Sequence, residues 1–544
     1  MALAGVAALA ALISVLATAL PYLSKRIIDE GLIGRRFDVL VWSCAAIVVL
    51  AAISFVLGGV NRLLYVRMSG RILFALREDV YAHLLKLSPR FFRRRPVGDL
   101  VTRLDGDVAE VQRFSTDTLL AFVNGVLLLV AAGAIMVALS WELALVAACA
   151  LPLHLLLRYR AGPYIAGTTR SVREQASRIT HFLVETLGSA KAVQGAAAER
   201  WELERLGEFN RGFLARLVSQ QVAGYAVGGI SSLLAHATTA TVFIVGGYRV
   251  VHGELTVGTL VAFTAYLTRT TGSAVSLMNL YTGYQRAAVS LRRVRELLDT
   301  EPAHCPTGPQ RQLTGSATGR LRFESVTYQP AGSARPVIDE LNLEVAGGSK
   351  IVVFGDSGAG KSTFVDLLRR FVEPDAGRIL LDGEPLSGYG IESLRRHVAV
   401  LETEPVMFRA SILYNLRYGH FDVPDAAVRE AAIRAGVDTF VDVLPRGYDT
   451  EVGSGGVGLS TGQRQRIAIA RALLGEPVVL VLDEATSNLD AVATRAMHEL
   501  IDRHFALRTR LVITHAPQAV PRADAVYEMR EGRLAEAERA RAHG

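Results

Sequence analysis

Long apolar runs alternate with polar, Arg-rich stretches over the first half of the chain. Because a helix needs roughly 20 apolar residues to cross a bilayer, these runs predict about six membrane-spanning helices. The first is expected to be a transmembrane helix rather than a signal peptide, since no basic segment precedes it and further apolar runs follow. The predicted spans are residues 3–22, 39–60, 117–139, 141–159, 226–250 and 258–281.

Two long polar stretches separate these spans, at residues 61–116 and 160–221. Their arginines place them on the cytoplasmic side, where Lys and Arg accumulate in membrane proteins. The short segment after the first span contradicts this rule, because the same topology puts it outside although it is basic. Its cations are Lys25, Arg26, Arg35 and Arg36, and its acids are Asp29, Glu30 and Asp38.

From residue 320 onward the pattern changes to that of a soluble α/β domain. The segments "KIVVF", "VVLVL" and "RLVIT" are continuous apolar runs, which are typical of parallel strands buried on both faces. Residues 301–319 are rich in Pro, Gly and Thr and predict a linker. We therefore expect an α-helical transmembrane domain over 1–300, an α/β domain over 320–537, and a charged tail over 538–544.

Composition and charge agree with a membrane protein. Hydrophobic residues make up 50% of the chain, and its three cysteines have neither metal-ligand nor disulfide spacing. The net charge of +7 is compatible with nucleic-acid binding. Cytoplasmic Lys and Arg of a membrane protein explain the charge better, so no nucleic-acid partner is expected.

The segment "GDSGAGKST" has the spacing G-x-x-x-x-G-K-[ST] between a predicted strand and a predicted helix. Its glycines free the backbone to wrap phosphates with N–H groups, and Lys361 is expected to reach the β and γ phosphates. The hydroxyl of Ser362 is expected to bind Mg²⁺. The predicted nucleotide-binding residues are Gly355, Asp356, Ser357, Gly358, Ala359, Gly360, Lys361, Ser362 and Thr363.

Two further segments complete a predicted ATP site. In "VVLVLDEATSNLD", Asp483 ends a strand and is expected to hold Mg²⁺, while Glu484 is expected to act as general base on the attacking water. In "LSTGQRQRIAIARALL", Ser460 is expected to cap a helix whose N-terminus is a second anion site. One domain cannot easily place two helix N-termini on one ATP, whereas two facing copies can.

On these motifs the chain resembles exporter-type ATP-binding cassette transporters over nearly its full length. The resemblance implies a Walker A motif at Gly355–Thr363, a Walker B motif with its catalytic carboxylate at Asp483 and Glu484, and a switch histidine at His515. It implies a D-loop at Ser487–Asp490 that includes Asp490. It also implies a signature motif that acts on ATP in trans, formed by Ser460, Thr461, Gly462 and Gln463 after Leu459.

The membrane half carries the resemblance as well. "FFRRRPVGDLVTRLDGDV" resembles the first intracellular loop of the family, and "GELTVGTLVAF" resembles the turn into its sixth helix. "ETLGSAKAVQGAAAE" is similar to the second intracellular loop. In the family the intracellular loops carry coupling helices that dock on the nucleotide domains. The resemblance therefore implies a half-transporter that works as a dimer. Its implied fold is a transmembrane domain of about six helices followed by an α/β P-loop NTPase domain with a helical subdomain.

The chain departs from the family at several site positions. Thr403 stands where a Gln senses Mg²⁺, and Thr461 stands where Gly is usual. Ser454 replaces a frequent Glu, and Pro330 replaces the aromatic residue that stacks on adenine. Tyr328, two residues before Pro330, is the alternative candidate for adenine. These departures leave a homodimer and a heterodimer both open.

The expected function is ATP-driven export of a substrate by alternating access. The partner is a second half-transporter, identical or related, and the protein is expected in a bacterial inner membrane with its nucleotide domain in the cytoplasm. An importer on the same architecture, such as a siderophore importer, is one alternative, and a non-transporting membrane ATPase that acts as sensor or scaffold is another. Polar residues within the spans, Arg269 among them, are expected to face the bundle interior because they are costly in lipid.

Overall fold

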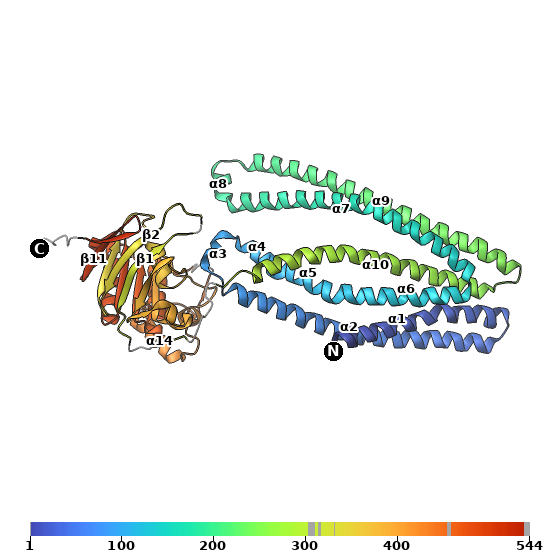
Figure 1. Cartoon of the computed structure of the whole chain (residues 1–544), viewed down its shortest axis with the longest axis horizontal. Helices are drawn as coiled ribbons and strands as arrows, with labels where there is room; N and C mark the ends of the chain where they lie inside the picture. Colours follow the sequence, from blue (N-terminus) through green and yellow to red (C-terminus); the bar gives the residue numbers. More distant parts are fainter. Residues whose placement is uncertain (1, 303–309, 314–316, 331, 454–457, 538–544) are drawn as a thin grey trace. The chain divides into compact units, whose positions relative to one another are not determined.

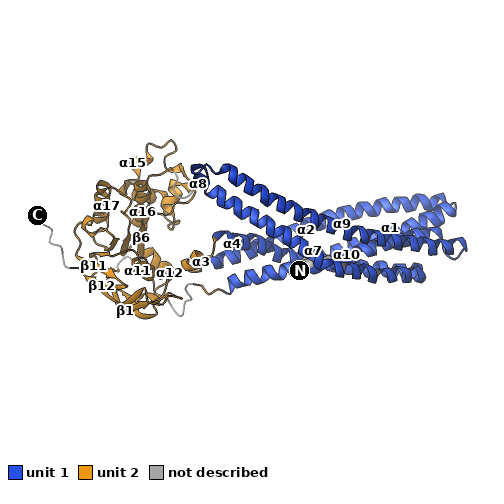
Figure 2. Cartoon of the chain, turned by 90° about the horizontal axis from the view of Figure 1, so that it is seen from above, with its two compact units in different colours: residues 1–84, 97–299 blue, residues 85–96, 300–544 orange. Residues whose placement is uncertain are grey.

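The computed structural model describes residues 2–302, 310–313, 317–330, 332–453 and 458–537 (Figure 1). Ser454, the charged tail and part of the predicted linker lie outside the described residues. The chain divides into two compact units, coloured separately in Figure 2. Unit 1 comprises Met1–Leu84 and Val97–Asp299, and unit 2 comprises Leu85–Pro96 and Thr300–Gly544.

Unit 1 is a bundle of long helices in which α1 packs along α2, α6 along α10, and α7 along α9 (Figure 1). A π-helical segment η1 follows α1, and the short elements α4, η2, α5 and η3 lead without a break into α6. The long helices are α1 (Ala2–Arg26), α2 (Phe37–Leu84), α6 (Leu119–Leu139), α7 (Trp141–Gly188), α9 (Glu199–Val251) and α10 (Val257–Leu298). The short ones are η1 (Ile27–Ile33), α4 (Val97–Thr102), η2 (Arg103–Asp107), α5 (Val108–Arg113), η3 (Phe114–Thr118) and α8 (Ala190–Gly195).

Five of these helical segments are long and apolar enough to cross a membrane, counted over the described residues. The sixth predicted span lies in α10, whose Thr, Ser and Gly residues lower its hydropathy. The polar stretches 61–116 and 160–221, expected as loops, are largely helical: α2 continues to Leu84 and α7 to Gly188. Their residues are good helix formers, and hydropathy reports only the part that lies in lipid.

Unit 2 contains two main sheets. The four-stranded sheet has the order β2-β1-β4-β5, and the six-stranded sheet has the order β12-β11-β3-β10-β9-β6. Strands β11, β3, β10, β9 and β6 are parallel, so the three apolar runs predicted as buried parallel strands are confirmed as neighbours. The strands are β1 (Leu321–Tyr328), β2 (Ile338–Val345), β3 (Lys350–Phe354), β4 (Ala376–Leu381), β5 (Glu384–Pro385), β6 (Val398–Glu402), β9 (Val479–Asp483), β10 (Thr509–Thr514), β11 (Ala525–Arg530) and β12 (Arg533–Glu536).

Two hydrophobic cores hold unit 2 together. The first joins both sheets around α11, and the second lies on the other face of the parallel sheet under a group of helices. This arrangement confirms the expected α/β domain with a helical subdomain. The helices are α3 (Pro89–Arg94), α11 (Lys361–Leu368), α12 (Ile391–His397), α13 (Ile412–Arg417), α14 (Asp425–Arg434), α15 (Asp438–Val441), α16 (Thr461–Gly475) and α17 (Ala491–His504).

Candidate functional site

The glycine-rich loop joins the end of β3 to the start of α11. Gly358 and Gly360 have φ angles of +86° and +107°, a left-handed conformation that favours glycine. A Cβ added to Gly355 would lie 2.3 Å from the main-chain oxygen of Met529, so only glycine fits there. The loop therefore curls tightly in front of the N-terminus of α11, where N–H groups and the helix dipole favour an anion.

Lys361 lies inside this loop, with 6% of the residue exposed. Its Nζ donates to the main-chain oxygens of Gly355 at 2.7 Å and Asp356 at 3.0 Å. The same Nζ is 3.9 Å from Oε1 of Glu484. The ammonium thus sits between the loop and the carboxylate that follows β9.

Glu484 and His515 form the second part of the site. Nε2 of His515 lies 2.6 Å from Oε1 of Glu484. Glu484 has a left-handed φ of 49°, and its N–H donates to the main-chain oxygen of Ile513 at 2.9 Å. This strained turn directs the Glu484 carboxylate to both Lys361 and His515. The structure therefore brings these three predicted residues together at the carboxyl ends of the parallel strands.

Asp483 is the last residue of β9 and lies beside this cluster. Burial raises the pKa of its carboxyl to about 6, and the nearby carboxylates of Glu484 and Glu402 add to the shift while Lys361 opposes it. Ionising a carboxyl in such a position is costly unless a cation joins it. Asp483 and the hydroxyl of Ser362 are oxygen donors of the kind that Mg²⁺ takes together with nucleotide phosphates. No cluster of three or more His, Cys, Asp or Glu suited to a metal occurs among the described residues, and such a Mg²⁺ site does not need one.

Thr403 follows β6, the strand next to β9. Its Oγ1 donates to the main-chain oxygen of Asp483 at 3.3 Å. Gln465, on α16, donates from Nε2 to the main-chain oxygens of Glu402 at 2.8 Å and Thr403 at 3.0 Å. The loop at Thr403 is therefore tied both to the strand end and to the signature helix. Sequence reasoning missed Gln465, because nothing in its local pattern points to a contact with β6.

The signature segment forms the N-terminus of α16. Ser460 and Gln463 make a capping box, in which Gln463 N donates to Ser460 Oγ at 3.3 Å and Ser460 N donates to Gln463 Oε1 at 2.8 Å. Arg464 donates to Thr461 Oγ1 at 3.2 Å, so the extra side chain at Thr461 is engaged with its own helix. Gly462 lies in the first turn of this helix.

Among the described residues the signature does not join the cluster around Lys361, whereas the D-loop meets it at Ser487, whose N–H donates to the main-chain oxygen of Glu484 at 3.0 Å. In the described parts of the molecule, no hydrogen bond or ion pair links the signature residues to Gly355–Thr363. Asp490 instead caps α17, with its Oδ1 accepting from Val492 N at 3.0 Å and Ala493 N at 2.7 Å. One chain thus supplies a phosphate-binding loop and, separately, a second capped helix N-terminus.

Tyr328, the candidate for adenine, is the last residue of β1. It is 8% exposed and packs in the first core of unit 2. The guanidinium carbon of Arg90 lies 4.5 Å from its ring centroid. Side-chain alternation in β1 turns the ring inward. The contact of Tyr328 with adenine stays a prediction.

The segment Leu85–Pro96 belongs to unit 2 although it precedes most of unit 1 in the chain. Besides the contact of Arg90 with Tyr328, Arg93 Nη2 forms an ion pair with Asp366 Oδ2 at 3.3 Å. Burial raises the pKa of the Asp366 carboxyl, and Arg93 opposes that shift. Asp366 lies on α11, the helix that follows the glycine-rich loop, so this segment is linked directly to the helix at the site.

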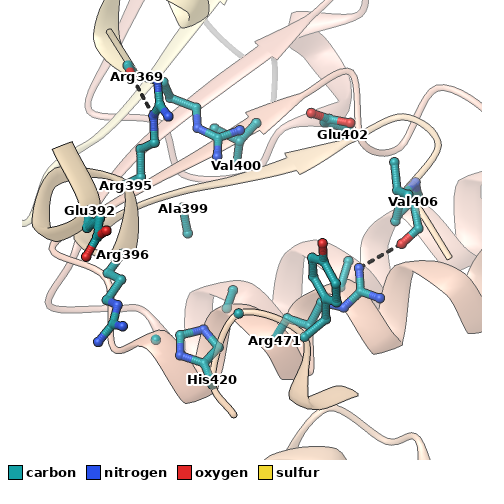
Figure 3. A pocket seen from close by; sticks show the side chains of 16 residues that line it. Arg369, Glu392, Arg395, Arg396, Ala399, Val400, Glu402, Val406, His420 and Arg471 are labelled. Carbon is teal, nitrogen blue, oxygen red and sulfur yellow. Dashed lines mark hydrogen bonds between the residues drawn. The ribbon is translucent and has the colours of Figure 1, made fainter. Parts of the chain in front are cut away.

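A cavity of about 550 Å³ lies between the sheet and the helical subdomain (Figure 3). It is lined by the side chains of Arg369, Arg395, Arg471 and Glu402, among others. Burial lowers the pKa of Arg395 and of Arg471 to about 10 each. Arg471 donates to the main-chain oxygen of Val406 at 2.8 Å, which Figure 3 shows as a dashed line. Arg471 therefore ties α16 to the segment that follows Thr403, whereas Arg395 donates to the main-chain oxygens of Arg369 and Arg370.

Comparison with known proteins identifies the family. The model of the ABC transporter transmembrane region matches residues 3–274, and the model of the ABC transporter domain matches residues 338–487. The chain belongs to the ABC transporter family. The fused arrangement of the two regions is the one expected from the motifs.

Similar proteins extend over most of the chain. An ATP-dependent lipid A-core flippase of Chromobacterium violaceum is 29% identical over 514 residues, covering 94% of this chain and 88% of the flippase. The ABC-type oligopeptide transporter ABCB9 of Rattus norvegicus is 30% identical over 95% of this chain and 68% of that protein. A bacterial Atm1-family ABC exporter with ATP bound has a TM-score of 0.84 and 26% identity, covering 98% of this chain and 94% of the exporter.

These comparisons confirm the expected class of activity. This ABC half-transporter is a multi-pass membrane protein that binds ATP, couples its hydrolysis to export, and dimerises. The importer and the non-transporting ATPase are not favoured, because the relatives are flippases and transporters and the similar structure is an exporter.

Proposed function

We propose that this ABC transporter exports its cargo with ATP held between the glycine-rich loop of one chain and the signature helix of a second half-transporter, identical or related. The observation that carries the proposal is the separation of the two anion sites within one chain. Lys361, Glu484 and His515 gather at one sheet edge, whereas the Ser460-capped helix N-terminus makes no bond to that loop among the described residues. A facing chain supplies the missing half.

Each group at the site has a proposed chemical role. The N–H groups of Gly355–Thr363 and the ammonium of Lys361 bind the β and γ phosphates. Glu484 takes the proton of the attacking water, and His515 fixes the orientation of that carboxylate through the 2.6 Å contact and reaches the γ-phosphate. Ser362 and Asp483 would hold Mg²⁺, which when bound neutralises phosphate charge. Ser460, Thr461, Gly462, Gln463 and Asp490 act on the nucleotide of the facing chain.

Coupling to the membrane helices is proposed to run through the segment Leu85–Pro96. Arg93 of this segment forms an ion pair with Asp366 on α11, the helix whose N-terminus binds the phosphates in this proposal. A movement of α11 when the phosphates bind or leave therefore displaces the segment Leu85–Pro96. The loop at Thr403 is a second coupling element. Because its hydroxyl faces the main chain of Asp483, Thr403 affects the metal site only through the strand end. We propose that unit 2 lies in the cytoplasm and that the membrane is a bacterial inner membrane.

The proposal is tested with the purified full chain, alone and with any sister chain, in lipid nanodiscs. We expect ATP turnover that requires Mg²⁺ and is lost in Lys361→Ala. In vesicles whose nucleotide domains face outward, we expect ATP-dependent accumulation of cargo in the lumen. Movement of cargo in the opposite direction, or turnover unchanged in Lys361→Ala, would refute the proposal.

A further inference from the structure

A second cavity, of about 520 Å³, lies in unit 1 between α1, α6 and α10. Its α6 wall is apolar and includes Ile135 and Leu139. On α10, Tyr266 is 0% exposed and donates its hydroxyl to the main-chain oxygen of Thr18 at 2.5 Å. Tyr22 and Lys25, from the last turns of α1, add a phenol and an ammonium to this wall. The cavity therefore combines an apolar surface with a single cation.

The Lys25 ammonium makes no hydrogen bond or ion pair within the described residues, although acidic residues lie on neighbouring segments. Those acids have other partners. Asp29 accepts from Thr256 Oγ1 at 2.6 Å and from Gly258 N at 2.8 Å, which caps the start of α10. The remaining acid pairs are Glu30 with Arg26 at 3.2 Å, Asp38 with Arg36 at 3.3 Å, and Arg249 with both Glu142 at 2.7 Å and Glu254 at 2.9 Å.

These ion pairs also bear on the segment after the first predicted span, which is basic although the predicted topology puts it outside the cell. Arg26 and Arg36 are each matched by an acid close in sequence. Lys25 is not matched, and it lines a cavity instead. A lysine beside apolar walls at the membrane boundary is stabilised by an anionic partner, so its position indicates an anionic ligand.

We propose that this cavity binds an amphiphile with a single anionic head group. The head group pairs with the Lys25 ammonium and accepts a hydrogen bond from the half-exposed Tyr22, and the acyl chain lies along Ile135 and Leu139. Lys25 is followed directly by the charged residues Arg26, Asp29 and Glu30, which are costly within the hydrocarbon core. We therefore place the site at head-group depth, where Tyr is favoured.

The sidedness of the site rests on the proposed function, since the cytoplasmic location of unit 2 places Lys25 at the outer leaflet. Two sources offer the same ligand chemistry there. One is an acidic phospholipid of the bilayer, and the other is a transported amphiphile on its way out. Both require the same pairing with Lys25, and they differ in their effect on ATP turnover.

The experiment measures lipid binding by the full-length protein in phosphatidylcholine nanodiscs. The probes are phosphatidylglycerol and phosphatidylcholine with the same fluorescent acyl chain. One lysine near an anionic head group corresponds to about a fivefold preference for phosphatidylglycerol. We expect Lys25→Gln to abolish the preference and Lys25→Arg to keep it. Arg35→Gln removes a nearby cation that does not line the cavity, and it should leave the preference unchanged.

The proposal is overturned if Lys25→Gln keeps the preference, or if Arg35→Gln reduces it equally. Stimulation of ATP turnover by phosphatidylglycerol in wild type but not in Lys25→Gln supports the site and assigns a transported amphiphile. Preference without stimulation supports the site and assigns a resident lipid. Failure of the proposed function would appear instead as unchanged ATP turnover in Lys361→Ala, a result that does not affect the lipid preference.

Discussion

Replacing Glu484 with Gln tests the chemistry of the site most sharply. In the wild-type chain, His515 Nε2 lies 2.6 Å from Oε1 of Glu484. The substitution keeps the size of the side chain and an oxygen that can accept a hydrogen bond from His515. It removes the group that takes the proton from water. A positioned general base contributes about 10² to 10⁴ in rate, so we expect turnover to fall at least about 100-fold, or roughly 2.7 kcal/mol in activation free energy.

The same substitution should not weaken ATP binding. The carboxylate lies 3.9 Å from Lys361 Nζ, a separation worth at most about 4 kcal/mol at an effective dielectric of 20. Because Lys361 also binds two main-chain oxygens and Glu484 is partly exposed, only a fraction of this energy is released when the charge is removed. Lys361 then turns more readily to phosphate, and we expect ATP affinity equal to or higher than that of wild type.

The assay compares steady-state phosphate release with binding of a fluorescent ATP analogue, in nanodiscs and with Mg²⁺. Glu499→Gln, an exposed carboxylate on α17, is the matched control and should behave as wild type. Turnover of Glu484→Gln within about threefold of wild type would refute the assignment of the base. Loss of ATP binding in the same variant would refute the charge argument.

Three further predictions concern neighbouring groups. Because the pKa of the Asp483 carboxyl is about 6, this group is protonated below that pH, and ATP turnover should rise as the pH increases through about 6. A higher Mg²⁺ concentration should lower the midpoint of this pH profile, and a midpoint that does not depend on Mg²⁺ contradicts the metal role. Arg93→Ala and Asp366→Asn should each reduce the stimulation of ATP turnover by cargo. Because Arg93 is largely exposed, a double-mutant cycle should give a coupling energy of only about 0.5–1 kcal/mol, and additive effects of the two substitutions contradict the link. Thr403→Gln should change the ratio of transport to ATP hydrolysis, because a longer amide would reach past the main chain of Asp483; unchanged rates of both contradict a coupling role.

Local patterns were enough to predict the parts of the site built from contiguous residues. The apolar runs before Gly355, Asp483 and His515 predicted parallel strands buried on both faces, because such strands lack polar alternation. The structure shows that these strands are neighbours in the sheet. The glycines predicted the tight loop, because Gly358 and Gly360 adopt the positive φ angles that such a turn requires. The chemistry at the strand ends then followed from the topology of the sheet.

Contacts between distant segments could not be predicted in this way. Arg93 and Asp366 are separated by 273 residues, and neither has a local signal that selects the other. Tyr328 was expected near adenine from its place in a strand, but whether that face is open depends on the core and on Arg90. Hydropathy marked the membrane spans but not the helical continuation of α2 and α7, because helix formation outside lipid leaves no apolar run.

The central claim is that ATP is shared between two chains, and a cross-linking measurement tests it directly. Cysteines replace the exposed Ser357 in one copy and the exposed Ser460 in another, after Cys44, Cys149 and Cys305 are replaced by Ser. We expect a cross-link between chains that forms with ATP and Mg²⁺ and disappears when Lys361→Ala is added to the Ser357 chain. Equal cross-linking with and without ATP, or no ATP-dependent link to a second copy or to a co-purified sister chain, would contradict the account.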